Sequence, residues 1–103
     1  MRIGIVVTNQ IYLAHAIGML DGAESRGWET LCFLTDTGVN LLADAAFVER
    51  ARKHPNSVSV CEHSIELYAS GKYDVRSISD IVAVGSQYKN AELARKCDKV
   101  LVF

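Results

Sequence analysis

The chain has 103 residues and a formal net charge of −1; hydrophobic residues make up 50% of it and charged residues 22%. This length and balance are typical of one soluble globular domain and exclude an intrinsically disordered chain. Acidic and basic residues are mixed along the sequence, so neither nucleic acid nor an anionic membrane surface is expected as a partner. We therefore expect a single domain over residues 1–103.

The apolar runs and the cysteines indicate the cellular compartment in which the protein is expected. No apolar run approaches the roughly 18–20 residues that span a bilayer. The apolar residues 3–7 lead into a polar turn, which favours a core strand over a signal peptide. The three cysteines lie 29 and 36 residues apart, a spacing of neither a disulfide framework nor a zinc site. We therefore expect a reducing cytoplasm and no bound metal.

Short apolar segments alternate with amphipathic ones through the first half of the chain. Residues 3–7 (IGIVV) are apolar on both faces, as in a central parallel strand. After the polar turn TNQ, apolar residues recur at helical spacing until Gly27, which is typical of a helix stop. A second strand is expected over residues 29–35, followed by the loop DTGVN and a helix over residues 41–53.

The same alternation continues in the second half. After the break at HPNS, the expected strands are residues 58–60, 81–85 and 99–103, and the expected helices are residues 62–70 and 86–96. Residues 72–80 fit either a short helix or a loop. This order predicts a three-layer α/β/α sandwich with a five-stranded, mainly parallel sheet.

Polar segments follow four of the expected strands. In open parallel sheets the ligand site lies beyond the carboxyl ends of the strands, so we place the candidate site there. The candidate binding residues at this edge are Thr8, Asn9, Gln10, Thr37, Gly38, Glu62, His63 and Ser86. Cys61 is the only strong nucleophile among these segments, and it is the candidate catalytic residue.

Cys61 stands where the strand-like pattern VSV gives way to a helix-like one. The start of a helix offers free N–H groups and a positive dipole end, which stabilise a thiolate, whereas Glu62 and Glu66 oppose it by like charge. Cys61 is therefore either a reactive thiol or buried packing. Cys32 in mid-strand and Cys97 on a helix face are expected to be structural.

The histidines and the basic residues are weaker signals. His15 is either solvated or at a subunit contact, and His63 points about 200° away from Cys61 on a helix, which disfavours a Cys–His pair. His54 is expected to cap a helix. Arg50, with its basic neighbours in the last turn of the helix over 41–53, complements the helix dipole and is expected to be solvated surface rather than a binding patch.

Cofactor motifs are missing from the sequence. There is no GxGxxG after the first strand and no P-loop, so we expect no cofactor. A third and weaker hypothesis is a small-anion or nucleotide binder that uses the turn at Thr8, Asn9 and Gln10, because a helix N-terminus can take an anion.

Three segments in order resemble the DsrE/TusD sulfur-relay family, and the likeness covers nearly the whole chain. MRIGIVVT resembles the opening strand of TusD-type subunits, and CDKVLVF (97–103) resembles their closing strand. Between them, VSVCEHSIELYASG is similar to the family's strand, cysteine, helix and terminal glycine. The chain departs from the family in being short between the second and third strands, and in the bulk of Glu62 and His63.

The resemblance implies a small persulfide carrier with a DsrE-like fold. The cysteine that matches Cys61 would accept sulfane sulfur from a donor protein and pass it to an acceptor protein. The resemblance also implies a homo-oligomer, either a trimer or a hexamer. Some family members lack the cysteine and serve as structural subunits, so the alternative is a non-catalytic binding or assembly subunit in which Cys61 is structural.

Overall fold

The computed structural model describes residues 1–103 and contains one five-stranded sheet in the order β4-β3-β2-β1-β5. Every neighbouring pair of strands is parallel, which confirms the predicted α/β sandwich. The strands are β1 (Arg2–Val7), β2 (Glu29–Leu34), β3 (Val58–Cys61), β4 (Val82–Gly85) and β5 (Lys99–Val102).

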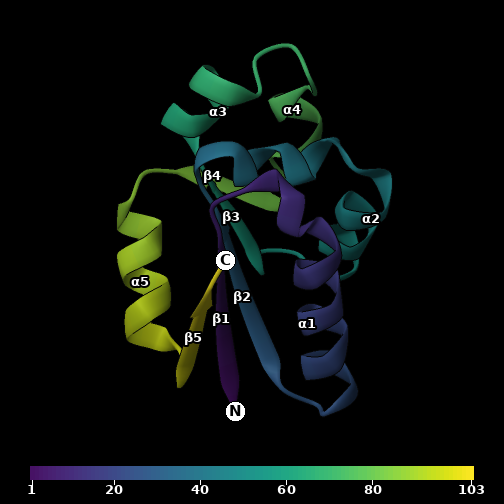
Figure 1. Ribbon diagram of the computed structural model, residues 1–103, viewed down its shortest axis with the longest axis vertical. Coiled ribbons are helices and arrows are strands. Elements are labelled where there is room, and N and C mark those ends of the chain that lie inside the picture. The colour runs from purple at the N-terminus through teal and green to yellow at the C-terminus, as the bar shows by residue number, and fades with distance from the viewer.

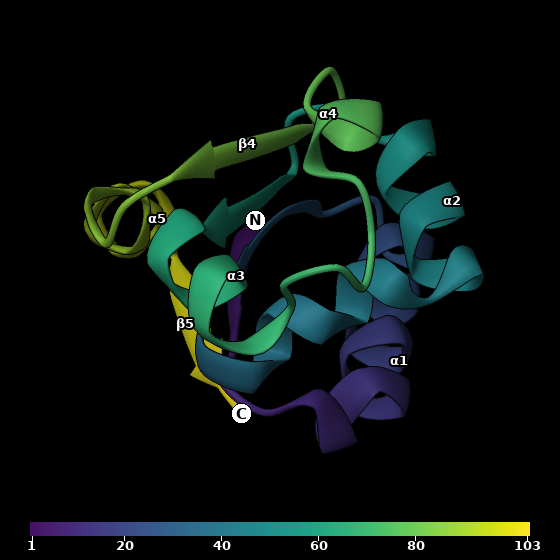
Figure 2. The ribbon, with the colours of Figure 1, turned by 90° about the horizontal axis from the view of Figure 1, so that it is seen from above.

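Helices cover both faces of this sheet (Figures 1 and 2). One face carries α1 (Leu13–Ser25) and α2 (Ala45–Lys53), and the other carries α5 (Tyr88–Lys96). The carboxyl edge carries the remaining short helices, which are η1 (Gln10–Tyr12), η2 (Asp36–Ala43), α3 (Glu62–Tyr68) and α4 (Val75–Ile78). The segment over residues 72–80, for which either a helix or a loop was expected, thus contains the short helix α4.

The second long helix begins later than the apolar pattern predicts. A helix was expected over residues 41–53, but a 3-10 helix runs through the expected loop to Ala43, and α2 starts at Ala45. The reason is Asp44, whose backbone is extended and whose carboxylate accepts the Phe47 N–H at 3.0 Å. Aspartate is a favoured N-cap residue, and here its capping bond overrides the continuous apolar spacing.

The two faces of the sheet carry unequal cores. The larger cluster lies on the side of α1 and α2 and contains Cys32, which is 1% exposed. The smaller cluster lies on the α5 side and consists of Val6, Phe33, Cys61 and Leu93. Because side chains alternate between the faces of a strand, Val60 of β3 joins the first cluster and Cys61 joins the second.

The carboxyl edge is closed by a tight crossing of η2 over the end of β1. Gly38 is buried there, and a Cβ at this position would overlap the Val7 carbonyl oxygen and lie 2.7 Å from the Val7 carbonyl carbon. The Val7 oxygen accepts the Thr35 N–H at 3.0 Å, so backbone bonds hold this crossing. Only glycine fits a backbone approach this close.

Replacing Gly38 therefore tests the crossing. We expect Gly38→Ala to lower the free energy of unfolding by about 1–3 kcal/mol or more, because the added methyl group must push backbone atoms apart. The matched control is Gly18→Ala within α1, where a Cβ meets nothing within 4 Å, and where alanine should raise the free energy by up to about 1 kcal/mol. Urea denaturation measures both. If both substitutions changed the free energy of unfolding equally, the close approach of Gly38 to the Val7 carbonyl would be contradicted.

Candidate active site

Cys61 is the last residue of β3 and the N-cap residue of α3. In the parallel register it lies beside Gly85, the last residue of β4. Its side chain faces α5 and is 4% exposed. The carboxyl ends of β3 and β4 and the starts of α3 and α5 meet here (Figure 2).

A chain of hydroxyl and amide groups surrounds this cysteine. Ser64 Oγ lies 3.3 Å from Thr35 Oγ1, and it accepts the Asp36 N–H at 2.9 Å. Gln87 Nε2 donates to Thr35 Oγ1 at 3.1 Å. Thr35 and Ser64 are buried polar side chains, and such groups are stable inside a protein only when hydrogen-bonded. When Thr35 is the donor of the bond between the two hydroxyls, the Ser64 proton is available to the Cys61 sulfur.

These donors act on the ionisation of Cys61. Burial alone would raise the pKa of the Cys61 thiol. Four hydrogen-bond donors lower it by more than burial raises it: the hydroxyl and N–H of Ser64, the amide of Gln87 and the backbone N–H of His63. The net pKa therefore lies below its ordinary value. Donors that stabilise the charged form favour ionisation.

The pKa values of the other two cysteines are shifted in the opposite direction, above their ordinary value. Burial raises the pKa of Cys32 to about 12, as expected for a thiol enclosed by hydrocarbon. Burial also raises the pKa of Cys97, although the nearby charge of Arg2 opposes it. Cys61 is thus the one cysteine of the three whose surroundings favour the thiolate, and the thiolate is the nucleophilic form.

The predicted neighbours of Cys61 play smaller parts. Glu62 and His63 are exposed on α3, and His63 acts on the sulfur through its backbone N–H. Ser86 lies at the start of α5, where its Oγ accepts the Tyr88 N–H at 3.3 Å. No Cys–His pair forms, in agreement with the spacing of the two residues.

The remaining predicted residues form a separate polar group above β1. Gln10 N–H donates to Thr37 Oγ1 at 3.2 Å, and Asn9 Oδ1 accepts the Ile11 N–H at 3.0 Å. Thr8 donates to the Phe103 carbonyl oxygen through both its N–H and its hydroxyl, at 2.7 and 2.6 Å. These bonds hold η1 against η2 and the end of β5. None of them reaches Cys61.

Three residues of the Cys61 site were not among the predicted ones: Thr35, Ser64 and Gln87. Ser64 had a usable signal, because a residue three positions after an N-cap places its amide and side chain back toward the cap. Gln87 belongs to the polar segment 85–87, which the sequence places at this edge, and Thr35 ends the expected strand 29–35, but only the strand order shows that both lie beside Cys61.

Comparisons with known proteins add no assignment. A scan against protein-family models finds no match, and a search of curated proteins finds none either. The side chains of the structure include no group of three or more His, Cys, Asp or Glu that could hold a metal ion. None of its helices has the length and apolar character needed to cross a membrane.

Removing the Ser64 hydroxyl tests the donor set. We expect Ser64→Ala to raise the pKa of Cys61 by about one pH unit, since a hydrogen bond to a charged group is worth about 1.5–3 kcal/mol. The rate of Cys61 alkylation by iodoacetamide, measured against pH, gives this pKa. The control is Ser70→Ala, a change at an exposed serine beyond α3. An unshifted profile for Ser64→Ala would show that the hydroxyl does not act on the sulfur.

Proposed function

We propose that this protein carries sulfane sulfur as a persulfide on Cys61 and passes it to a partner protein. The observation that supports this function is the lowered pKa of Cys61, produced by hydrogen-bond donors at the carboxyl edge, in a chain whose other two cysteines have raised pKa values. The resemblance of the segment around Cys61 to the DsrE/TusD family supports the same chemistry.

Two exchange steps make up the transfer. The Cys61 thiolate attacks the outer sulfur of a donor persulfide; a new S–S bond forms, the donor S–S bond breaks, and the donor leaves as a thiolate. In the second step an acceptor thiolate attacks the outer sulfur now on Cys61, and Cys61 leaves as a thiolate. Neither step needs an added oxidant or reductant. Donors that lower the Cys61 pKa assist both, because Cys61 is the nucleophile in the first and the leaving group in the second.

Access to the sulfur is controlled at the start of α5. Cys61 is 4% exposed, whereas Gln87 is exposed at the carboxyl edge, and its side-chain amide lowers the pKa of the Cys61 thiol. In the proposed reaction the Gln87 side chain turns aside and a partner approaches from this edge. Exposed apolar side chains on the two helices that meet here suit protein docking: Leu67 and Tyr68 on α3, and Tyr88 on α5.

The partners in this proposal are a sulfur-donor and a sulfur-acceptor protein, without a cofactor, in the cytoplasm. The family resemblance further supports a homo-oligomer of three or six chains. Nucleic acid is not a direct partner in this scheme, since the chain has a net charge of −1 and no run of basic residues.

A second candidate function rests on the burial of Cys61. Its sulfur packs with Val6, Phe33 and Leu93, as a small hydrophobic residue would. On this alternative the protein is a binding or assembly subunit and Cys61 has no chemical role. Native Cys61 would then react with thiol reagents no faster than Cys32 and Cys97.

Loading with sulfur tests the first function. After incubation with glutathione persulfide, we expect a mass increase of one sulfur atom, located on Cys61 by peptide mapping. Cys61→Ser should lose this increase, and Cys97→Ser should keep it, because Cys97 is partly buried and has a raised pKa. Equal loading of Cys61→Ser and the parent protein would exclude Cys61 as the carrier.

A further inference from the structure

The strand β5 is an uncovered edge of the sheet (Figure 1). All of its residues are exposed, and three of them are apolar: Val100, Leu101 and Val102, with exposed fractions of 38%, 36% and 66%. The helices α1 and α5 pack instead against β1, β2 and β3. Proteins usually protect such an edge with proline, charges or a bulge. In β5 there is no proline, Lys99 is the only charged residue, and the register with β1 is unbroken.

The outer side of β5 offers unpaired backbone groups. Phe103, the residue after β5, donates its N–H to the Val6 carbonyl oxygen and accepts the Thr8 N–H, so its backbone groups point toward β1. Backbone groups of successive residues point alternately to the two sides of a strand. Those of Val100 and Val102 therefore point away from β1, and neither residue takes part in a backbone hydrogen bond outside the sheet. An edge of this kind accepts a further strand.

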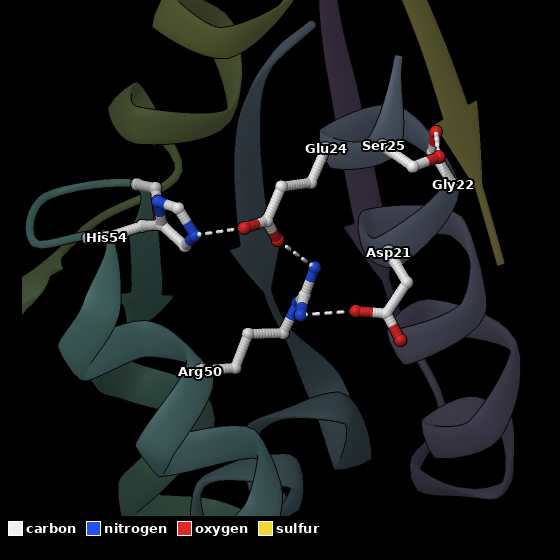
Figure 3. Close-up of polar contacts among 7 residues, drawn as sticks. Asp21, Gly22, Glu24, Ser25, Arg50 and His54 are labelled. Carbon is white, nitrogen blue, oxygen red and sulfur yellow. Dashed lines mark hydrogen bonds and ion pairs between the residues drawn. The ribbon is translucent and has the colours of Figure 1, made fainter. Parts of the chain in front are cut away.

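The flank of α1 that faces α2 is already occupied within the chain. Asp21 and Glu24 lie on this flank, and Arg50 of α2 pairs with both (Figure 3). The expectation that Arg50 is solvated surface was wrong: its side chain is 18% exposed and is held between these two carboxylates. His54 caps α2 through its backbone, and its Nε2 lies 3.1 Å from Glu24 Oε1. These contacts leave no free surface on this flank for a partner.

The opposite flank of α1 borders β5 and is free. It carries His15, for which either solvent or a subunit contact was expected, and Met19, and both are exposed. The centroid of the His15 ring lies 6.3 Å from that of Phe103. Leu101 lies on the same face of the sheet, because its partner in β1 is Ile5, which belongs to the larger core. The exposed flank of α1 therefore continues the apolar surface of β5.

A second copy of the same edge matches β5 residue by residue. When two antiparallel copies of β5 meet about a two-fold axis at Leu101, Val100 of each copy lies opposite Val102 of the other. Their outward backbone groups then form reciprocal hydrogen bonds, and the two Leu101 side chains meet on the α1 side. With the axis at Val100 instead, Val102 would lie opposite Asp98, and Lys99 opposite Leu101. That register places charged side chains against apolar ones and is disfavoured.

We propose that two copies of this chain pair through β5, about a two-fold axis at Leu101, so that their sheets join into one. Two-fold pairs are the commonest protein oligomers, and the net charge of −1 on each chain opposes pairing little. A stable dimer buries about 800 Å² on each partner, and the flank of α1 with His15 and Met19 adds to the area of β5. The contact does not rest on the sulfur chemistry of Cys61, because β1 and β2 lie between β5 and β3.

Sedimentation and hydrogen exchange on the unaltered protein test the pairing. At high concentration the protein should sediment with twice the 11.3 kDa mass of one chain. The amides of Val100 and Val102 should then exchange at least about tenfold more slowly than in dilute solution, because pairing gives them acceptors. The amide of Phe103 is the internal control, since it is already bonded to the Val6 carbonyl oxygen and should change less. These measurements do not depend on whether a variant folds.

Variants then test the register. Val102→Glu should raise the dimer dissociation constant at least about tenfold, because each pair would hold a carboxylate against Val100 twice. Adding Val100→Lys to Val102→Glu should restore pairing, because lysine then faces glutamate across the axis. Ser70→Glu is the control, since it adds the same charge at an exposed residue beyond α3. If β5 is one contact of a larger even-numbered assembly, Val102→Glu should halve that assembly.

Three results would each overturn the inference. The first is a parent protein that sediments only as a monomer or a trimer at every concentration. The second is a Val102→Glu variant that assembles as the parent protein does. The third is a double variant, Val100→Lys with Val102→Glu, that pairs no better than Val102→Glu alone.

Discussion

The close approach of Gly38 to the Val7 carbonyl sets the shape of the carboxyl edge. The same carbonyl oxygen accepts the Thr35 N–H, so the chain must turn sharply at Asp36, whose φ of 50° lies in the left-handed region. A non-glycine residue adopts this conformation at a cost of about 1–2 kcal/mol. The turn aims the Asp36 N–H at Ser64, and Ser64 then contacts Cys61. The backbone geometry at the end of β1 thus fixes the position of Ser64, a donor that acts on the cysteine at the end of β3.

The ionisation of the three cysteines follows from which groups surround each sulfur. Cys32 is enclosed by hydrocarbon on the face of the sheet covered by α1 and α2, and nothing there stabilises a charge. Cys61 is almost as buried, yet it lies where strand ends leave amide and hydroxyl groups unpaired by the sheet. Burial alone would keep both thiols protonated and inert. Only Cys61 has hydrogen-bond donors beside it, at the carboxyl edge of the sheet, and these favour its thiolate.

The sequence predicts the strands well because buried parallel strands are apolar on both faces, as residues 3–7 are. It predicts the start of α2 poorly, because a local capping bond at Asp44 competes with the apolar spacing. The sequence places Gln87 at the carboxyl edge but does not pair it with Thr35, since the two lie 52 residues apart and meet only through the strand order. Arg50 was misjudged for a related reason: helix dipole arguments treat a helix alone, whereas its partners belong to α1.

The unequal cores have a consequence for motion. On the α5 side, the buried cluster has four residues, against 19 on the other side. Segments with little buried apolar area open at a lower free energy than the rest of a domain, and hydrogen exchange detects such openings. The side of the sheet under α5 therefore opens at a lower free energy than the side under α1. Because Cys61 and Leu93 belong to the same small cluster, the opening that frees α5 also uncovers the sulfur.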